Sequence, residues 1–112
     1  MGIVIGIDPG VSGAVAVLSA DGIATHDTPT VEVKRGQKLK TEISPQMLAA
    51  IIRARNPSIA ILEIVGAMPG QGVSSMFQFG RGVGMLEGIL SALDVPVTYI
   101  SPAGWQKAVN AR

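Results

Sequence analysis

Two short apolar runs at the start of the chain, residues 2–7 and 13–18, constrain its fold most strongly. Both are rich in β-branched residues, and each ends in a turn signal: an Asp-Pro-Gly sequence from Asp8 and an Asp-Gly pair at Asp21. A third run, residues 23–28, follows at once and alternates weakly between apolar and polar residues. Connections this short leave no room for a helix, so we expect three strands in an antiparallel meander.

Helical and strand patterns alternate in the second half of the chain. Ser44 and the proline after it are typical of the start of a helix, which Asn56 and the proline after it end. The apolar run 58–63 predicts a strand that ends in a carboxylate, and the run 96–100 predicts another strand.

The clearest helix covers about residues 75–93. Its apolar side chains recur at 3,4,3,4,3 spacing and form one stripe, which consists of Met76, Phe79, Val83, Leu86, Leu90 and Leu93. Ser74 or Ser75 is a candidate for its N-cap. Because a helix between two strands implies a crossover and parallel pairing, the element order predicts an α/β fold. We expect a single domain over residues 1–112, with a five-stranded mixed sheet (βββαβαβα) and helices on its faces.

Composition excludes several classes of protein. The length of 112 residues suits one domain, and the hydrophobic share of 47% is enough for a sizeable core. The absence of Cys excludes disulfides and thiolate metal sites, and the only histidine, His26, is expected to have no role. The chain has no apolar run long enough to cross a membrane and no basic segment typical of a signal peptide, so we expect a cytoplasmic protein. The net charge of +1 indicates neither a nucleic-acid nor a membrane partner.

Two carboxylates stand at the ends of apolar strands. Asp8 follows the first run, and Glu63 ends the run 58–63. If the two strands are neighbours, the carboxylates lie side by side, and two like charges there require a shared proton or a bound cation. An all-oxygen pair favours Mg²⁺ or Mn²⁺. The plainer interpretations are that Asp8 is a turn former and that the carboxylate of Glu63 faces solvent.

Three segments resemble one known family. Residues 5–18, IGIDPGVSGAVAVL, resemble the first strand and turn of the RuvC branch of the RNase H-like nucleases. Residues 61–90, ILEIVGAMPGQGVSSMFQFGRGVGMLEGIL, resemble the next signature of phage-type RuvC Holliday junction resolvases, and residues 98–109, TYISPAGWQKAV, resemble the segment after it. The first motif alone is shared with sugar kinases and actin-like ATPases, which also need a second phosphate loop. The second motif is far more specific.

The resemblance implies an RNase H-like fold and a structure-selective endonuclease that cuts DNA near a four-way junction during recombination and repair. It implies that Asp8 and Glu63 are the catalytic residues and hold two Mg²⁺ ions, one to activate water and one to stabilise the leaving 3′-oxygen. It also implies a homodimer that uses the helix over about 75–93, because a two-fold dimer suits a two-fold junction.

Several side chains are candidates for DNA contact. The glycine-rich loop ahead of the long helix offers backbone N–H groups and hydroxyls to phosphates, although a loop that only connects strand to helix is the plainer interpretation. The candidates in and beyond this loop are Gln71, Ser74, Ser75, Gln78, Arg81 and Lys107. Residues 29–43 show no periodicity and are expected to form a flexible basic loop. Its cations either grip a DNA arm or are merely solvated: Lys34, Arg35, Lys38 and Lys40.

The glycines and aromatic residues leave two interpretations open. Gly80, Gly84 and Gly88 recur every four residues of the long helix and permit close approach, either by the chain's own sheet or by a second copy. Phe77 and Trp105 could stack on bases, but core packing is the default expectation for them and for Tyr99. Glu87, in the middle of the helix, is not placed among the metal ligands.

Two departures from the family pattern stand out. The family takes further acids from a C-terminal helix, whereas no acidic residue follows Asp94 here. We therefore expect a fragment of a longer protein, and the alternative is a branched-DNA-binding module that does not cut. Bacterial relatives carry an aromatic wedge three positions after the second carboxylate, where this chain has Gly66.

Overall fold

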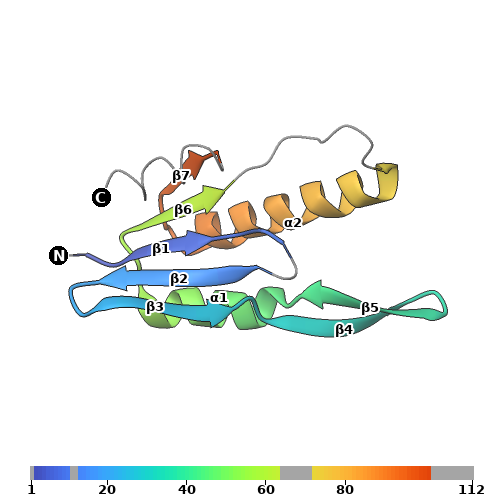
Figure 1. Ribbon diagram of the computed structural model, residues 1–112, viewed down its shortest axis with the longest axis horizontal. Coiled ribbons are helices and arrows are strands. Elements are labelled where there is room, and N and C mark those ends of the chain that lie inside the picture. Colours follow the sequence, from blue (N-terminus) through green and yellow to red (C-terminus); the bar gives the residue numbers. More distant parts are fainter. Residues whose placement is uncertain (1, 11–12, 64–71, 102–112) are drawn as a thin grey trace.

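The computed structural model describes residues 2–10, 13–63 and 72–101 (Figure 1). The elements in chain order are β1 (Val4–Ile7), β2 (Ala14–Ser19), β3 (Gly22–Asp27), β4 (Thr30–Arg35), β5 (Lys38–Ile43), α1 (Pro45–Arg55), β6 (Ile59–Glu63), α2 (Val73–Ala92) and β7 (Val97–Ile100). Five strands form one sheet in the order β3-β2-β1-β6-β7, and β4 and β5 form a separate hairpin. The helix expected after residue 101 lies outside the described residues.

The expected mixed sheet is confirmed. β1 pairs antiparallel with β2, and β2 with β3, which is the predicted meander. β6 pairs parallel with both β1 and β7, so α1 and α2 occupy the crossover connections that parallel pairing requires. β1 and β6 both point towards the end of the molecule from which the β4–β5 hairpin and the first turns of α2 project (Figure 1).

One face of the sheet carries the core. The register aligns the buried strand residues in cross-strand rows: Ile5 with Val17 and Ala60, and Ile7 with Val15 and Leu62. Both described helices cover this face, α1 with Leu48 and Ile52 and α2 with Leu86 and Leu90, all of them fully buried. The opposite face of these central strands is therefore free of α1 and α2.

Residues 29–43 are not the flexible loop expected from the sequence. They contain the two six-residue strands of a hairpin, in which Arg35 pairs with Lys38 and leaves a two-residue turn at Gly36 and Gln37. Gly36 has a φ of 66°, a left-handed conformation that a tight hairpin turn needs and glycine adopts without strain. The alternation of Val31 and Val33 with charged residues was the available signal, but the many cations hid it.

Helix α1 begins and ends as expected. The Ser44 hydroxyl accepts a hydrogen bond from the Met47 N–H at 3.3 Å, and Asn56 ends the helix in a left-handed conformation. The N-cap expected for α2 is wrong, because Gly72 occupies that position without a side-chain cap and Ser74 and Ser75 lie inside the first turn. None of the helices in the described ranges combines the length and the apolar character that a membrane span needs.

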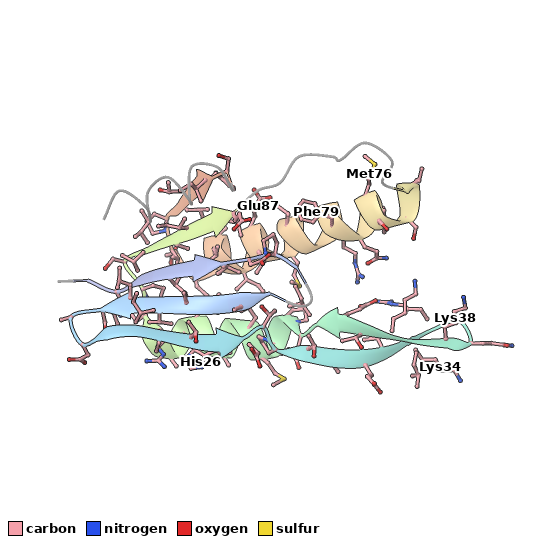
Figure 2. The ribbon with its side chains drawn as sticks, in the orientation of Figure 1. His26, Lys34, Lys38, Met76, Phe79 and Glu87 are labelled. Atoms are coloured by element: carbon pink, nitrogen blue, oxygen red, sulfur yellow. The ribbon has the colours of Figure 1, made fainter. Side chains whose placement is uncertain are left out.

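The apolar stripe of α2 is buried only in its second half. Leu86 and Leu90 are fully buried, whereas Met76, at the start of the stripe, is 43% exposed. Phe77, which follows Met76 and does not belong to the stripe, is 66% exposed. Figure 2 shows Met76 on the part of α2 that extends past the strands of the five-stranded sheet. The expectation that Phe77 packs in the core is therefore wrong, because the sheet is shorter than this helix.

Candidate functional site

The two strand-end carboxylates lie at the same edge of the sheet. β1 and β6 are parallel neighbours, and Ile7 stands directly opposite Leu62. Asp8 and Glu63 are the next residues after that pair, which meets the condition stated from the sequence. Because alternate side chains point to opposite faces, both carboxylates follow core residues and lie on the face away from α1 and α2.

Both carboxylates line one hollow of about 230 Å³. Part of its floor consists of small residues, since Gly6, Ala14 and Ala16 contribute at most a methyl group each, and Ile61 and Ile100 also line the hollow. A Cβ built on Gly6 would meet nothing within 4 Å. The small floor leaves room for an ion, its waters and part of a substrate beside the carboxylates.

Local backbone contacts fix the position of Asp8. Its Oδ1 accepts a hydrogen bond from the Gly10 N–H at 3.0 Å, and its own N–H donates to the Ala14 carbonyl oxygen at 3.3 Å. A Cβ on Gly13 would lie 2.8 Å from the Asp8 Cγ and 2.9 Å from the Asp8 carbonyl oxygen. Only glycine at position 13 therefore allows β2 to approach Asp8 this closely.

The donor set fits a hard divalent cation. Mg²⁺ commonly uses one or two protein carboxylates and completes its shell with water and substrate phosphates. Asp8 and Glu63 form no ion pair with a described residue, so their joint negative charge lacks a side-chain counterion there. The described residues contain no cluster of three or more His, Cys, Asp or Glu. A second ion would therefore need oxygen ligands beyond this pair.

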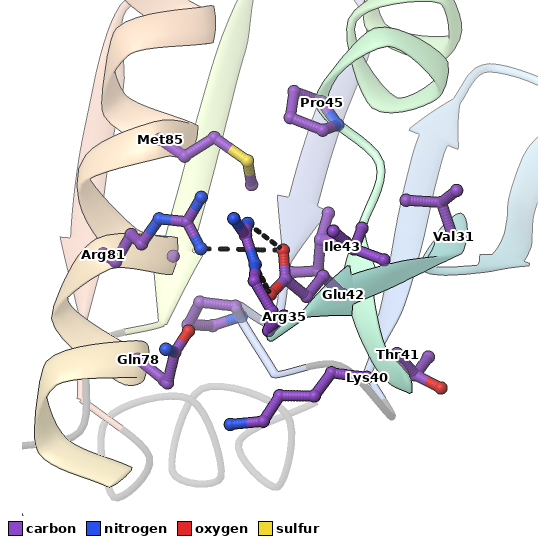
Figure 3. Close-up of a pocket in the computed structure, with 13 residues that line it drawn as sticks. Val31, Arg35, Lys40, Thr41, Glu42, Ile43, Pro45, Gln78, Arg81 and Met85 are labelled. Carbon is purple, nitrogen blue, oxygen red and sulfur yellow. Dashed lines mark hydrogen bonds and ion pairs between the residues drawn. The ribbon is translucent and has the colours of Figure 1, made fainter. Parts of the chain in front are cut away.

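The structure brings part of the predicted DNA-contact set together. Ser74, Ser75, Gln78 and Arg81 lie exposed on the first turns of α2. Gln78 and Arg81 line a groove of about 470 Å³ between α2 and the β4–β5 hairpin, together with Arg35 and Lys40 (Figure 3). Gln71 and Lys107 lie outside the described residues, as do Gly66 and Trp105.

An ion cluster connects the hairpin to α2 across this groove. Arg35 donates to both carboxylate oxygens of Glu42, at 3.0 Å from Nε and 2.8 Å from Nη2, and Arg81 Nη1 lies 3.6 Å from the same carboxylate (Figure 3). The hydrogen bond from Arg35 lowers the pKa of Glu42 below its ordinary value and raises that of Arg35. Glu42 could not be predicted from the sequence, because a loop was expected over residues 29–43 and a loop defines no cross-strand partners.

Three residues outside these sites have structural partners. Tyr99 is 49% exposed rather than buried in the core, so that expectation is wrong. Its hydroxyl donates to the Glu87 carboxylate, and this hydrogen bond raises the pKa of Tyr99. Because Tyr99 stands opposite the buried Leu62 in the sheet, its hydrogen bond with Glu87 lies on the face that the helices cover. His26 Nε2 lies 3.0 Å from Arg55 Nη2 and links β3 to the end of α1.

Comparisons with known proteins identify the fold. No family model and no curated protein matches the chain. Thermus thermophilus RuvC in complex with a Holliday junction substrate is similar at a TM-score of 0.64 and 12% identity, over 92% of this chain and 66% of that one. A second T. thermophilus RuvC structure gives 0.56 and 13%, over 89% and 64%. The crystal structure of the yeast mitochondrial Holliday junction resolvase Ydc2 gives 0.42 and 18%, over 97% and 56%.

These comparisons confirm the expected RNase H-like fold, the one that RuvC has. The chain spans slightly less than two thirds of the length of the two RuvC structures.

Proposed function

We propose that this chain is the nuclease domain of a RuvC-like Holliday junction resolvase of the phage type, which cuts DNA at four-way junctions with divalent metal ions. The observation that carries the proposal is the position of Asp8 and Glu63, which follow the paired ends of two adjacent parallel strands and line one hollow together with Gly6, Ala14 and Ala16. On a RuvC-like fold, that arrangement supports metal-assisted phosphodiester hydrolysis. It gives less support to the plainer interpretation, in which Asp8 only forms a turn and the Glu63 carboxylate only faces solvent.

The residues of the chain have distinct tasks in this proposal. Asp8 and Glu63 would hold the ions together with water and substrate phosphate oxygens, and the ions when bound would supply an activated water and stabilise the leaving 3′-oxygen. Gly6 keeps the floor open so that a phosphodiester can approach the two carboxylates. The exposed side chains on α2, Ser74, Ser75, Gln78 and Arg81, contact phosphates and orient the scissile strand.

The experiment that tests this function uses a labelled four-way junction and a linear duplex that contains the sequence of two of its arms. The chain is incubated with each in Mg²⁺, in Mn²⁺ and in EDTA. We expect nicks in the junction with either metal, no nicks in EDTA and little cutting of the duplex. Junction binding without nicks in any metal would contradict the nuclease. That result would favour the second candidate, a branched-DNA-binding module, which the pair of only two described carboxylates also allows.

A homodimer through α2 forms the next part of the proposal. Gly80, Gly84 and Gly88 lie on exposed positions of α2, and a Cβ on any of them would meet nothing within 4 Å. The sheet of the same copy therefore gives no reason for these glycines, although each costs about 1 kcal/mol of helix propensity relative to Ala. Close approach by α2 of a second copy supplies a reason, and a two-fold dimer matches a four-way junction.

Gly84→Ala tests the dimer. In the separate monomer the substitution is expected to raise the free energy of unfolding by up to about 1 kcal/mol, because the added methyl favours helix and meets no atom of the same copy. In the dimer the same methyl enters the contact and weakens association, which sedimentation at several protein concentrations measures. Gly82→Ala is the matched control, since its Cβ would lie at an ordinary 3.6 Å from the Pro9 carbonyl oxygen of the same copy. A wild-type chain that stays monomeric at every concentration would contradict the dimer.

A further inference from the structure

The β4–β5 hairpin has almost no core of its own. It projects from the end of the molecule towards which β1 and β6 point (Figure 1). Nearly all its side chains are exposed. A two-stranded ribbon is marginally stable by itself in water, so its position depends on contacts with the rest of the molecule. One contact to α2 is the ion cluster, in which Arg81 of α2 engages Glu42 of the inner half and Arg35 engages the same carboxylate. The chain thus holds an exposed ribbon at a defined place beside the strand ends.

Charge is distributed unevenly along this ribbon. Its outer half carries four cations and no acid: Lys34, Arg35, Lys38 and Lys40. Glu32 and Glu42 lie in the inner half, and Glu42 is paired with arginines. Lys34, Lys38 and Lys40 are exposed and form no ion pair with a described residue. Lys34 and Lys38 lie on opposite sides of the hairpin end (Figure 2).

The register places Arg35, Lys38 and Lys40 on one face of the ribbon, and Arg35 and Lys40 line the groove. Arg35 pairs with Lys38, Val33 with Lys40 and Val31 with Glu42, and such alternate pairs share one face of a ribbon. That face lines the groove of about 470 Å³ opposite Gln78 and Arg81 of α2 (Figure 3). The groove is therefore lined by three cations, Arg35, Lys40 and Arg81, against a single carboxylate, Glu42, which Arg35 and Arg81 already engage.

The groove also reaches the turn beside the candidate metal site. Pro9, the residue after Asp8, lines it together with Gly82 of α2. A polyanion that follows the ribbon into this groove is thereby brought to the edge of the sheet that carries Asp8 and Glu63.

We propose that the β4–β5 hairpin is an arm that binds duplex DNA through its phosphates, with the ion cluster as the positioning contact to α2. This inference rests on the proposed function and adds to it the element that holds a duplex arm of the junction. The free lysines contact phosphates on either side of the hairpin end, and Gln78 and Arg81 contact the same duplex from the groove. Since phosphates carry no sequence information, the arm strengthens binding to the junction and to a linear duplex alike.

The test is a variant in which Lys34, Lys38 and Lys40 are all replaced by Gln. Binding to a labelled four-way junction and to a linear duplex is measured by fluorescence anisotropy in EDTA over a series of salt concentrations. We expect at least about tenfold weaker binding at low salt, by a similar factor for both DNAs. The slope of log affinity against log salt should fall by about 0.9 for each phosphate that the variant no longer neutralises. Far-UV circular dichroism and thermal unfolding establish that the variant is folded.

The control replaces the same three lysines by Arg, which keeps the charge and is expected to bind like the wild type. Unchanged affinity and salt slope in the Gln variant would overturn the inference, and so would an equal loss of affinity in the Arg variant. These outcomes are separate from failure of the proposed function. If the wild type binds and cuts junctions and the Gln variant binds equally well, only the proposed role of the arm is contradicted. If the wild type binds no DNA, both the arm and the proposed function are contradicted.

Discussion

Asp8→Asn is expected to abolish cleavage of a four-way junction and to leave binding of that junction nearly unchanged. The amide is isosteric with the carboxylate, and its oxygen can still accept the hydrogen bond from the Gly10 N–H, so the turn stays folded. The substitution removes an anionic ligand beside Glu63. Metal-ion catalysis supplies several kcal/mol of transition-state stabilisation, so we expect the cleavage rate to fall by at least about a hundredfold.

The measurement is single-turnover cleavage in Mg²⁺, paired with junction affinity in EDTA. Asp21→Asn is the matched control, because it makes the same change of charge at an exposed residue in the turn between β2 and β3. It should cut at the wild-type rate. Cleavage by the Asp8 variant at a rate within a fewfold of wild type would show that Asp8 is not a metal ligand.

Gly13→Ala is expected to damage both stability and activity. The new Cβ would lie 2.8–2.9 Å from three atoms of Asp8, including its carbonyl oxygen, so the turn or β2 must move. Overpacking of this kind costs about 1–3 kcal/mol of unfolding free energy. Since a misplacement of about 1 Å at a reacting group can cost a hundredfold in rate, cleavage should fall by about tenfold to a hundredfold.

Thermal unfolding and single-turnover cleavage measure the two effects. Gly6→Ala is the control for stability, because it adds the same methyl to the neighbouring strand in open space. Its free energy of unfolding should not fall. A Gly13→Ala variant with wild-type stability and activity would mean that the turn relaxes freely and that Asp8 needs no fixed position.

The sheet and the helices could be predicted because their sequence signals are local. The apolar runs, their turns and the 3,4,3,4,3 spacing each indicate one type of element, and element order then decides parallel or antiparallel pairing. The β4–β5 hairpin was missed because its outward-facing cations cover both faces and its turn at Gly36 lacks the Asn-Gly or Asp-Gly pair.

The carboxylate pair could be predicted only conditionally, because Asp8 and Glu63 lie side by side only if the strands that precede them are neighbours in the sheet. The register of Ile7 with Leu62 meets that condition. Periodicity could not show how far the sheet reaches along α2, so Phe77 was wrongly expected in the core. Glu42 pairs with Arg35 across the hairpin and with Arg81 of α2, and the second of these pairs joins residues far apart in sequence, so no local pattern indicates it.

The proposed function requires a divalent cation to bind between Asp8 and Glu63. Paramagnetic Mn²⁺, added in small amounts to ¹⁵N-labelled chain, broadens the amide signals nearest to the ion. We predict selective broadening at Gly6, Ala14 and the two carboxylate residues, reversed by excess Mg²⁺ and absent in Asp8→Asn. Unchanged signals there, or broadening centred on the hairpin acids Glu32 and Glu42 instead, would contradict the claim.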